Sequence, residues 1–156
     1  MRVLGVDPGA RRIGVAVSDE DGVLASPVRT LEVRGGAAGL SRALDSLARI
    51  VRDQQASEVV IGLPLKLDGR EGEAARRARR FASGLEGRVD VRVVLWDERM
   101  TTLQAERALR EGGVRGGRQR QVVDQVAAAV ILQSYLDARR ERDGHGDAVD
   151  GGSEGR

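Results

Sequence analysis

Carboxylate side chains follow two β-rich runs of this 156-residue sequence. Asp7 ends the run that starts at Val3 and precedes a Pro-Gly pair, and Asp97 and Glu98 follow the run that ends at Trp96. Open α/β sheets bind their ligands at the carboxyl ends of strands, so these positions suit catalysis or metal binding. An ordinary turn or helix cap would use the same residue types. Position alone leaves both interpretations open.

Asp124 is the more informative acidic residue. Ala127, Ala128 and Ile131 follow it by three, four and seven residues, so on a helix all four share one face. A carboxylate on a buried face is costly unless a cation or several donors compensate it, although a surface Asp near a helix N-terminus would also be stable. If a first strand, a last strand and this helix converge at one sheet edge, their carboxylates could form a magnesium site.

The residues that the sequence lacks narrow the chemistry. It contains no Cys, and its single His, His145, lies among glycines and aspartates near the C-terminus. Thiolate nucleophiles, disulfides and Cys-based zinc sites are therefore excluded, and a catalytic triad would have to recruit that one imidazole. Any enzymatic activity is expected to depend on carboxylates.

Charge is distributed unevenly along the chain. The formal net charge is +2, but residues 141–156 hold two arginines against five acidic residues, about −3, which leaves about +5 on residues 1–140. Nearly all of the positive charge is arginine, whose planar guanidinium binds phosphate oxygens in pairs. A basic body is compatible with nucleic-acid binding, although high arginine content can also be compositional.

Hydrophobic periodicity predicts an α/β domain. Three short β-rich runs, separated by Pro8-Gly9 and Asp21-Gly22, predict antiparallel strands, and Pro27 places the third at an edge. Gly9 and Gly14 are interpreted as permitting a tight hairpin. Later elements are expected as a helix through Leu40 to Val51, a buried strand 58–63, a helix 73–85, a strand 89–96, a helix 101–111 that Thr101 and Gln104 would cap, and a helix 121–140.

This order predicts a mixed five-stranded sheet with helices on both faces. In that sheet the three antiparallel strands come first and the parallel strands follow. Residues 1–140 are expected to form one domain. Residues 141–156, rich in glycine and acidic residues, have little to bury and are expected to be a disordered tail.

Four ordered motifs over about residues 1–138 resemble the YqgF/RuvX family. They are DPGARRIG at 7–14, GLP at 62–64 with DG at 68–69, DERMTT at 97–102, and Asp124 followed by the two alanines and ILQ at 131–133. Members of that family are described as Holliday junction resolvases and as nucleases that mature the 5′ end of pre-16S ribosomal RNA. The resemblance implies a ribonuclease-H-like fold.

The resemblance also implies a site. The acidic set of the family corresponds to Asp7, Glu98 and Asp124, while Asp97 is the weaker candidate because adjacent strand residues point to opposite faces. Asp7 would bridge two Mg²⁺ or Mn²⁺ ions roughly 4 Å apart, and the other two carboxylates would each complete one coordination sphere. Six basic residues are expected to contact nucleic acid: Arg11, Arg12, Lys66, Arg115, Arg118 and Arg120. Family members commonly have Asn where this chain has Lys66.

The expected function is metal-dependent hydrolysis of phosphodiester bonds in structured nucleic acid, with pre-16S ribosomal RNA as the first choice. The alternatives are a resolvase for four-way DNA junctions and a non-catalytic RNA-binding factor in ribosome assembly. Ribosomal precursor particles are possible partners, and the protein is expected to be a monomer or a homodimer in the cytoplasm. No membrane association is expected, because the longest uncharged apolar run, Val126 to Leu132, is far shorter than the ~20 residues that a span needs.

Overall fold

The computed structural model describes residues 1–101 and 119–150, with the side chains of the last helix described from 123 to 144. Its elements, in chain order, are β1 (Arg2–Pro8), β2 (Arg12–Ser18), β3 (Ala25–Glu32), α1 (Gly36–Asp53), β4 (Ala56–Leu63), α2 (Glu73–Glu86), β5 (Arg92–Asp97), the short 3-10 helix η1 (Glu98–Met100) and α4 (Gln119–Asp150). In the part of the chain so described, none of the helices is both long enough and apolar enough to cross a membrane.

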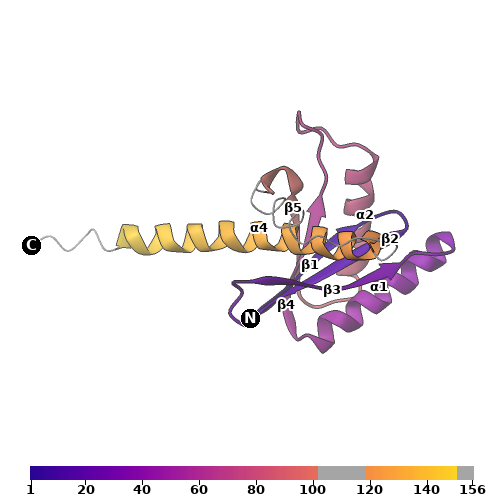
Figure 1. Ribbon diagram of the computed structural model, residues 1–156, viewed down its shortest axis with the longest axis horizontal. Helices are drawn as coiled ribbons and strands as arrows, with labels where there is room; N and C mark the ends of the chain where they lie inside the picture. Colours follow the sequence, from indigo (N-terminus) through magenta and orange to yellow (C-terminus); the bar gives the residue numbers. More distant parts are fainter. Residues whose placement is uncertain (102–118, 151–156) are drawn as a thin grey trace, which may run out of the picture.

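The five strands form one mixed sheet in the order β3-β2-β1-β4-β5 (Figure 1). β1 pairs antiparallel with β2 and parallel with β4, while β2 pairs antiparallel with β3 and β4 parallel with β5. The prediction of three antiparallel strands followed by parallel ones is therefore confirmed. Because β1 is the central strand, its carboxyl end lies in the middle of one edge of the sheet.

Turn chemistry explains the hairpin between β2 and β3. The Asp19 carboxylate accepts the backbone N–H of Val23 at 2.7 Å, and Gly22 adopts a φ of 68°, a value that a glycine reaches without strain. Pro27 lacks an N–H, and it lies in β3 at the outer edge of the sheet. The edge position predicted from this proline is confirmed.

Helices cover both faces of the sheet, as the element order predicted. α1 and α2 pack on one face, where Leu4, Val6 and Ile61 are buried together with Leu47 and Phe81. α4 packs on the other face, where Ala128, Leu132 and Tyr135 are buried against the strands. Along β1, Val3 faces α4 and Leu4 faces the other helices, so the alternation of strand side chains puts Asp7 on the α4 face.

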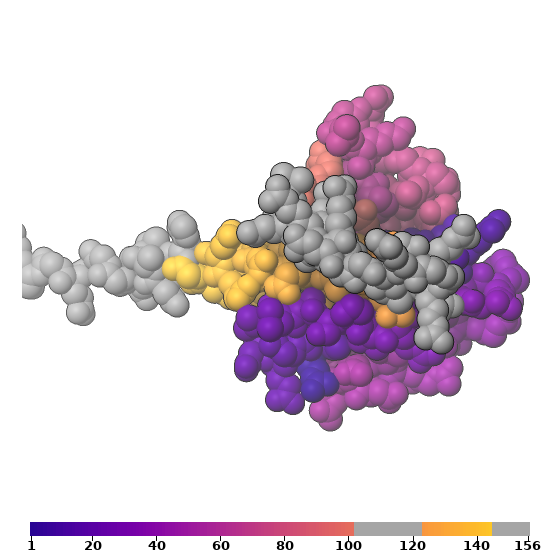
Figure 2. Space-filling view, viewed as in Figure 1, coloured from indigo at the N-terminus to yellow at the C-terminus, as the bar shows by residue number. Residues whose placement is uncertain are grey.

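The last helix differs from its prediction. Helix α4 continues to Asp150, whereas periodicity predicted an end near Arg140. Apolar contacts with the sheet stop earlier, since Leu136 is the last described buried side chain and residues 140–144 are exposed. Backbone hydrogen bonds can extend a helix past its packed residues, and the end of α4 projects from the body in Figure 1, as do its described side chains up to residue 144 in Figure 2. The division of the chain into a domain and a tail at residue 140 stays a prediction, and the predicted helix 101–111 lies outside the described residues.

Candidate active site

Asp7 is half-buried near the carboxyl end of the central strand, with a glycine on each neighbouring strand. Gly14 of β2 is its antiparallel partner. On the parallel side, Val6 pairs with Ile61, so Gly62 of β4 follows in register beside Asp7. Neither neighbour presents a side chain on the α4 face. The sheet therefore leaves space on both sides of this carboxylate.

Gly14 allows α4 to approach the sheet. A Cβ atom at position 14 would lie 1.9 Å from the backbone oxygen of Asp124, a separation that no side chain could tolerate. Gly5 acts in the same way about two turns further along α4, where a Cβ would lie 2.6 Å from that of Leu132. The interpretation of Gly14 as a hairpin residue is therefore wrong. Its small size is needed in mid-strand, because the helix that carries Asp124 rests directly on it.

Gly62 makes room for Glu98. A Cβ at position 62 would lie 2.5 Å from Glu98 Oε1 and 2.7 Å from Ile131 Cδ1. Glu98 begins the short helix η1, so its carboxylate turns back over the sheet instead of continuing along β5. Asp97, one residue earlier, is held by Arg99, whose Nη2 donates to the Asp97 carboxylate at 2.7 Å. Of the two adjacent acids, the structure brings Glu98 to Asp7 and engages Asp97 in an ion pair.

Two side chains tie the segment around Glu98 to α4. Ser134 Oγ donates to the backbone oxygen of Met100 at 2.8 Å and accepts the Trp96 indole N–H at 3.2 Å. The Trp96 ring also meets Tyr135 edge-on, with ring centroids 5.3 Å apart. These contacts hold both ends of the segment that carries Glu98 against the helix that carries Asp124. Tyr135 is 6% exposed and belongs to the core.

Proximity and burial change the protonation of the two central acids. Burial, and next the negative charge of Asp124, raise the pKa of Asp7 to about 6. Burial raises the pKa of Glu98 to about 7, with further contributions from the negative charges of Asp7 and Asp97. By contrast, hydrogen bonding from Arg99 lowers the pKa of Asp97. The three predicted carboxylates thus form a chain of electrostatic neighbours with Asp7 in the middle.

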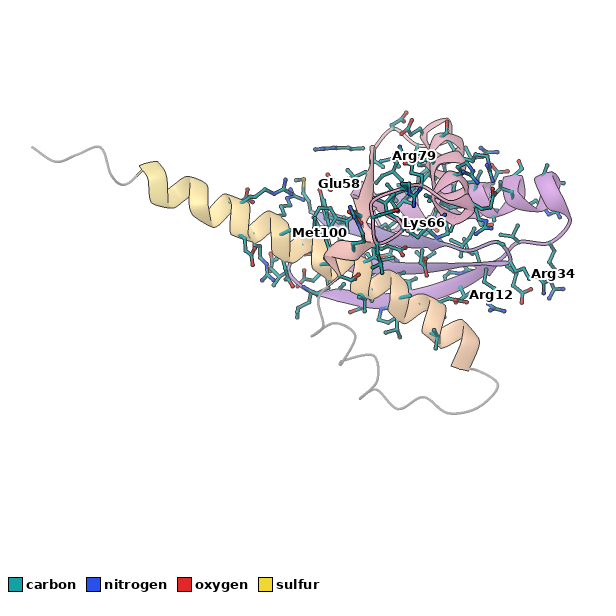
Figure 3. All side chains as sticks on the ribbon, turned by 90° about the horizontal axis from the view of Figure 1, so that it is seen from above. Arg12, Arg34, Glu58, Lys66, Arg79 and Met100 are labelled. Carbon is teal, nitrogen blue, oxygen red and sulfur yellow. The ribbon has the colours of Figure 1, made fainter. Side chains whose placement is uncertain are left out.

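Asp124 already has a cationic partner. Arg12 Nε donates to Asp124 Oδ2 at 2.7 Å, and both side chains are partly exposed. Figure 3 shows Arg12 at the end of the molecule where α4 begins. Within the described ranges, no three His, Cys, Asp or Glu side chains gather closely enough to hold a metal ion. In donor chemistry and charge, Asp7 and Glu98 fit a divalent cation, because hard cations prefer carboxylate oxygens and neither acid has an ion-pair partner among the described residues.

The other predicted basic residues are placed unevenly. Arg11 is exposed in the turn before β2 and lines, with Arg12 and Arg34, a cavity of about 260 Å³. Lys66 is exposed on the turn after β4, away from Arg12 in Figure 3. Arg115 and Arg118 lie outside the described residues, and so does the side chain of Arg120.

Three residues that position the site were missed from the sequence. Arg99 fixes Asp97, and its Nη1 also donates to the backbone oxygen of Leu67 at 3.4 Å, which connects the turn after β4 to the end of β5. Ser134 and Gly62 position Glu98 by a hydrogen bond and by an absent side chain. Gly62 was visible in the GLP motif as a glycine inside an otherwise apolar strand, a pattern that indicates close approach. Ser134 had no comparable signal.

Comparison with known proteins shows the family. Residues 1–138 match the family model for RuvX, described as a Holliday junction resolvase. Relatives from Nocardia farcinica and Myxococcus xanthus, both named "Putative pre-16S rRNA nuclease", are 50% and 44% identical over 143 residues. These alignments cover 88% of this chain and 78% of the first relative, and 92% of this chain and 92% of the second.

Solved structures show the same fold. The RuvC structure from Thermus thermophilus has a TM-score of 0.61 at 16% identity and covers 90% of this chain and 97% of that one. RuvC in complex with a Holliday junction substrate has a TM-score of 0.58 at 18% identity and covers 90% and 96%. At this identity the likeness establishes the ribonuclease-H-like architecture. The chain therefore belongs to the RuvX family of nucleases and has a ribonuclease-H-like fold.

Proposed function

We propose that this protein is a divalent-metal-dependent endonuclease that processes the 5′ end of pre-16S ribosomal RNA. The observation that carries the proposal is the pair of half-buried carboxylates, Asp7 and Glu98, at the carboxyl edge of the sheet with pKa values of about 6 and 7. Among the residues that the structure describes, neither group has an ion-pair partner to compensate the negative charge gathered there. A site of that kind is stabilised by a hard cation and destabilised without one.

The proposed metal ligands are Asp7, Glu98 and Asp124, with Mg²⁺ or Mn²⁺ as the cation. When bound, such ions lower the pKa of an attacking water and stabilise the leaving oxygen of a phosphodiester. Asp7 is the central ligand because it is the electrostatic neighbour of each of the other two acids. The hydrogen bond from Ser134 to the backbone of Met100, two residues after Glu98, and the close contact of Gly14 with the backbone of Asp124 would keep the ligands in place as substrate binds.

The chain's own cations would bind the substrate backbone. Arg12 is paired with Asp124, and with the exposed Arg11 it also lines a surface cavity. Guanidinium groups at that place can hold the phosphates next to the scissile bond without reading bases. Lys66, Arg115, Arg118 and Arg120 stay predicted contacts further along the nucleic acid.

RNA is the favoured substrate because relatives that are 44% to 50% identical to this chain carry the name of a pre-16S rRNA nuclease. A four-way DNA junction is the second candidate, which the description of the family model favours. The fold similarity to RuvC does not discriminate between these substrates, since one architecture serves many functions.

The test is cleavage of two end-labelled substrates, a 16S RNA fragment with its 5′ extension and a four-way DNA junction. We expect the RNA to be cut at discrete sites with Mg²⁺ or Mn²⁺ and to stay intact with Ca²⁺, whose looser coordination suits two-metal geometry poorly. Faster cleavage of the junction would establish the resolvase instead. Binding of the RNA without cleavage under all metals would leave the protein as a non-catalytic assembly factor.

A further inference from the structure

The ion pair between Arg12 and Asp124 conflicts with the proposed use of both residues. Arg12 is expected to bind a substrate phosphate, and Asp124 is expected to bind a metal ion. In the structure they bind each other instead, with Arg12 Nε donating to Asp124 Oδ2 at 2.7 Å. One oxygen of the third carboxylate is therefore committed to a guanidinium.

Charge explains why this pair forms. Asp7 has an acidic neighbour on each side, and Arg99, which follows Glu98 in the chain, is engaged by Asp97. Arg12 is thus the cation that compensates the cluster on the Asp124 side. A guanidinium and a divalent cation both satisfy a carboxylate, but they cannot occupy the same lone pairs together.

The place of Arg12 also allows the pair to open. Its side chain is 36% exposed, and the cavity of about 260 Å³ that it lines is also lined by Arg11 and Arg34. Glu32, which also lines that cavity, is paired with Arg34 and so does not compete for the Arg12 guanidinium. A phosphate group that entered the cavity would offer Arg12 oxygens equivalent to those of Asp124.

We propose, on the basis of the proposed function, that Arg12 is a positioning residue that couples nucleic-acid binding to metal binding. Without substrate, its guanidinium holds Asp124 and weakens metal binding. When a backbone phosphate takes the guanidinium, the Asp124 carboxylate is released to the metal. By linkage, nucleic acid must then raise metal affinity, and metal must raise nucleic-acid affinity by the same factor.

The experiment is a Mn²⁺ titration of the full-length protein by calorimetry, with and without a phosphorothioate-backbone RNA strand that resists hydrolysis. Without RNA, Arg12→Gln should bind Mn²⁺ about fivefold more tightly than the wild type, and RNA should improve its affinity much less than it improves that of the wild type. Arg12→Lys retains the cation and should return the affinity toward the wild-type value.

Arg34→Gln is the matched control, because it removes one positive charge from the same cavity without touching a carboxylate of the site. It should change Mn²⁺ affinity less than twofold, which separates the specific ion pair from a general charge effect. Suppose that Asp7→Asn abolishes Mn²⁺ binding but that a folded Arg12→Gln binds Mn²⁺ no more tightly than the wild type. That result would overturn the coupling and leave the proposed metal site standing. If the wild type and Asp7→Asn bind Mn²⁺ equally, the proposed metal site fails and the coupling fails with it.

Discussion

Asp7 and Glu98 are acids whose charged forms the fold disfavours, and this has a consequence for stability. The pKa of Asp7 rises from 3.8 to about 6, so between about pH 4 and pH 6 the folded protein binds more protons than the unfolded chain. Stability therefore falls as pH rises through that window, and the same holds for Glu98 between 4.5 and about 7. In chelator, the free energy of unfolding should be lower at pH 8 than at pH 5.

Asp7→Asn should remove part of this dependence. We expect the variant to be more stable than the wild type by about 1 to 2 kcal/mol at pH 8 in chelator and equally stable below about pH 3, where Asp7 is protonated in both the folded and the unfolded state. Denaturant unfolding at several pH values measures the difference. If the difference in the free energy of unfolding between Asp7→Asn and the wild type did not grow with pH, the burial of charge at Asp7 would be contradicted.

The adjacent acids Asp97 and Glu98 provide a matched pair for testing the site. Glu98→Gln should lower the cleavage rate by about 100-fold or more, because it removes a charge beside Asp7. Asp97→Asn leaves the site carboxylates in place and breaks an ion pair with Arg99, so its rate should stay within about tenfold of the wild type. Single-turnover rates at saturating Mg²⁺ measure both. If Asp97→Asn lowered the cleavage rate more than Glu98→Gln did, Asp97 would be the metal ligand instead of Glu98.

At the scale of elements, the contact between α4 and the sheet decides where Asp124 lies. Gly14→Ala would set a Cβ against a backbone oxygen, which no change of rotamer can relieve. We expect a loss of about 2 to 3 kcal/mol in stability and a loss of activity from displaced Asp124. Gly144→Ala is the control, because a Cβ there meets no atom within 4 Å, and it should be neutral or stabilising on an exposed helix. Thermal unfolding of both variants measures these effects. If Gly14→Ala were as stable as the wild type, the close approach of α4 to the sheet at Gly14 would be refuted.

Elements with a local signal could be predicted from the sequence, and contacts between distant elements could not. Turn residues at Asp21-Gly22 and the proline of β3 indicated the hairpin and the edge, and apolar spacing indicated the helices. The size requirement at Gly14 depends on a helix more than a hundred residues later, so it has no local signature. The same holds for Ser134 and for the pairing of Arg12 with Asp124. The end of α4 was misplaced because apolar periodicity reports packing, and this helix outlasts its packing.

At the scale of the whole molecule, charge separates the body from the C-terminal segment. Residues 141–156 carry about −3, and the last turns of α4, up to Asp150, lead away from the sheet (Figure 1). Deleting residues 141–156 should leave the melting temperature within about 2 °C, because no described side chain beyond Leu136 is buried. It should strengthen nucleic-acid binding about two- to threefold at low salt, by removing repulsion that salt would otherwise screen. A large drop in melting temperature would place residues 141–156 inside the folded domain.

The central claim is that Asp7, Glu98 and Asp124 together form a nuclease site. Its most direct test is the single-turnover cleavage of 5′-extended 16S RNA in Mg²⁺ by the wild type, Asp7→Asn and Asp124→Asn, purified identically and shown to be folded. We expect discrete cleavage by the wild type and, for each variant, no cleavage above that of a chelator blank. Cleavage at the wild-type rate by either folded variant would contradict this claim.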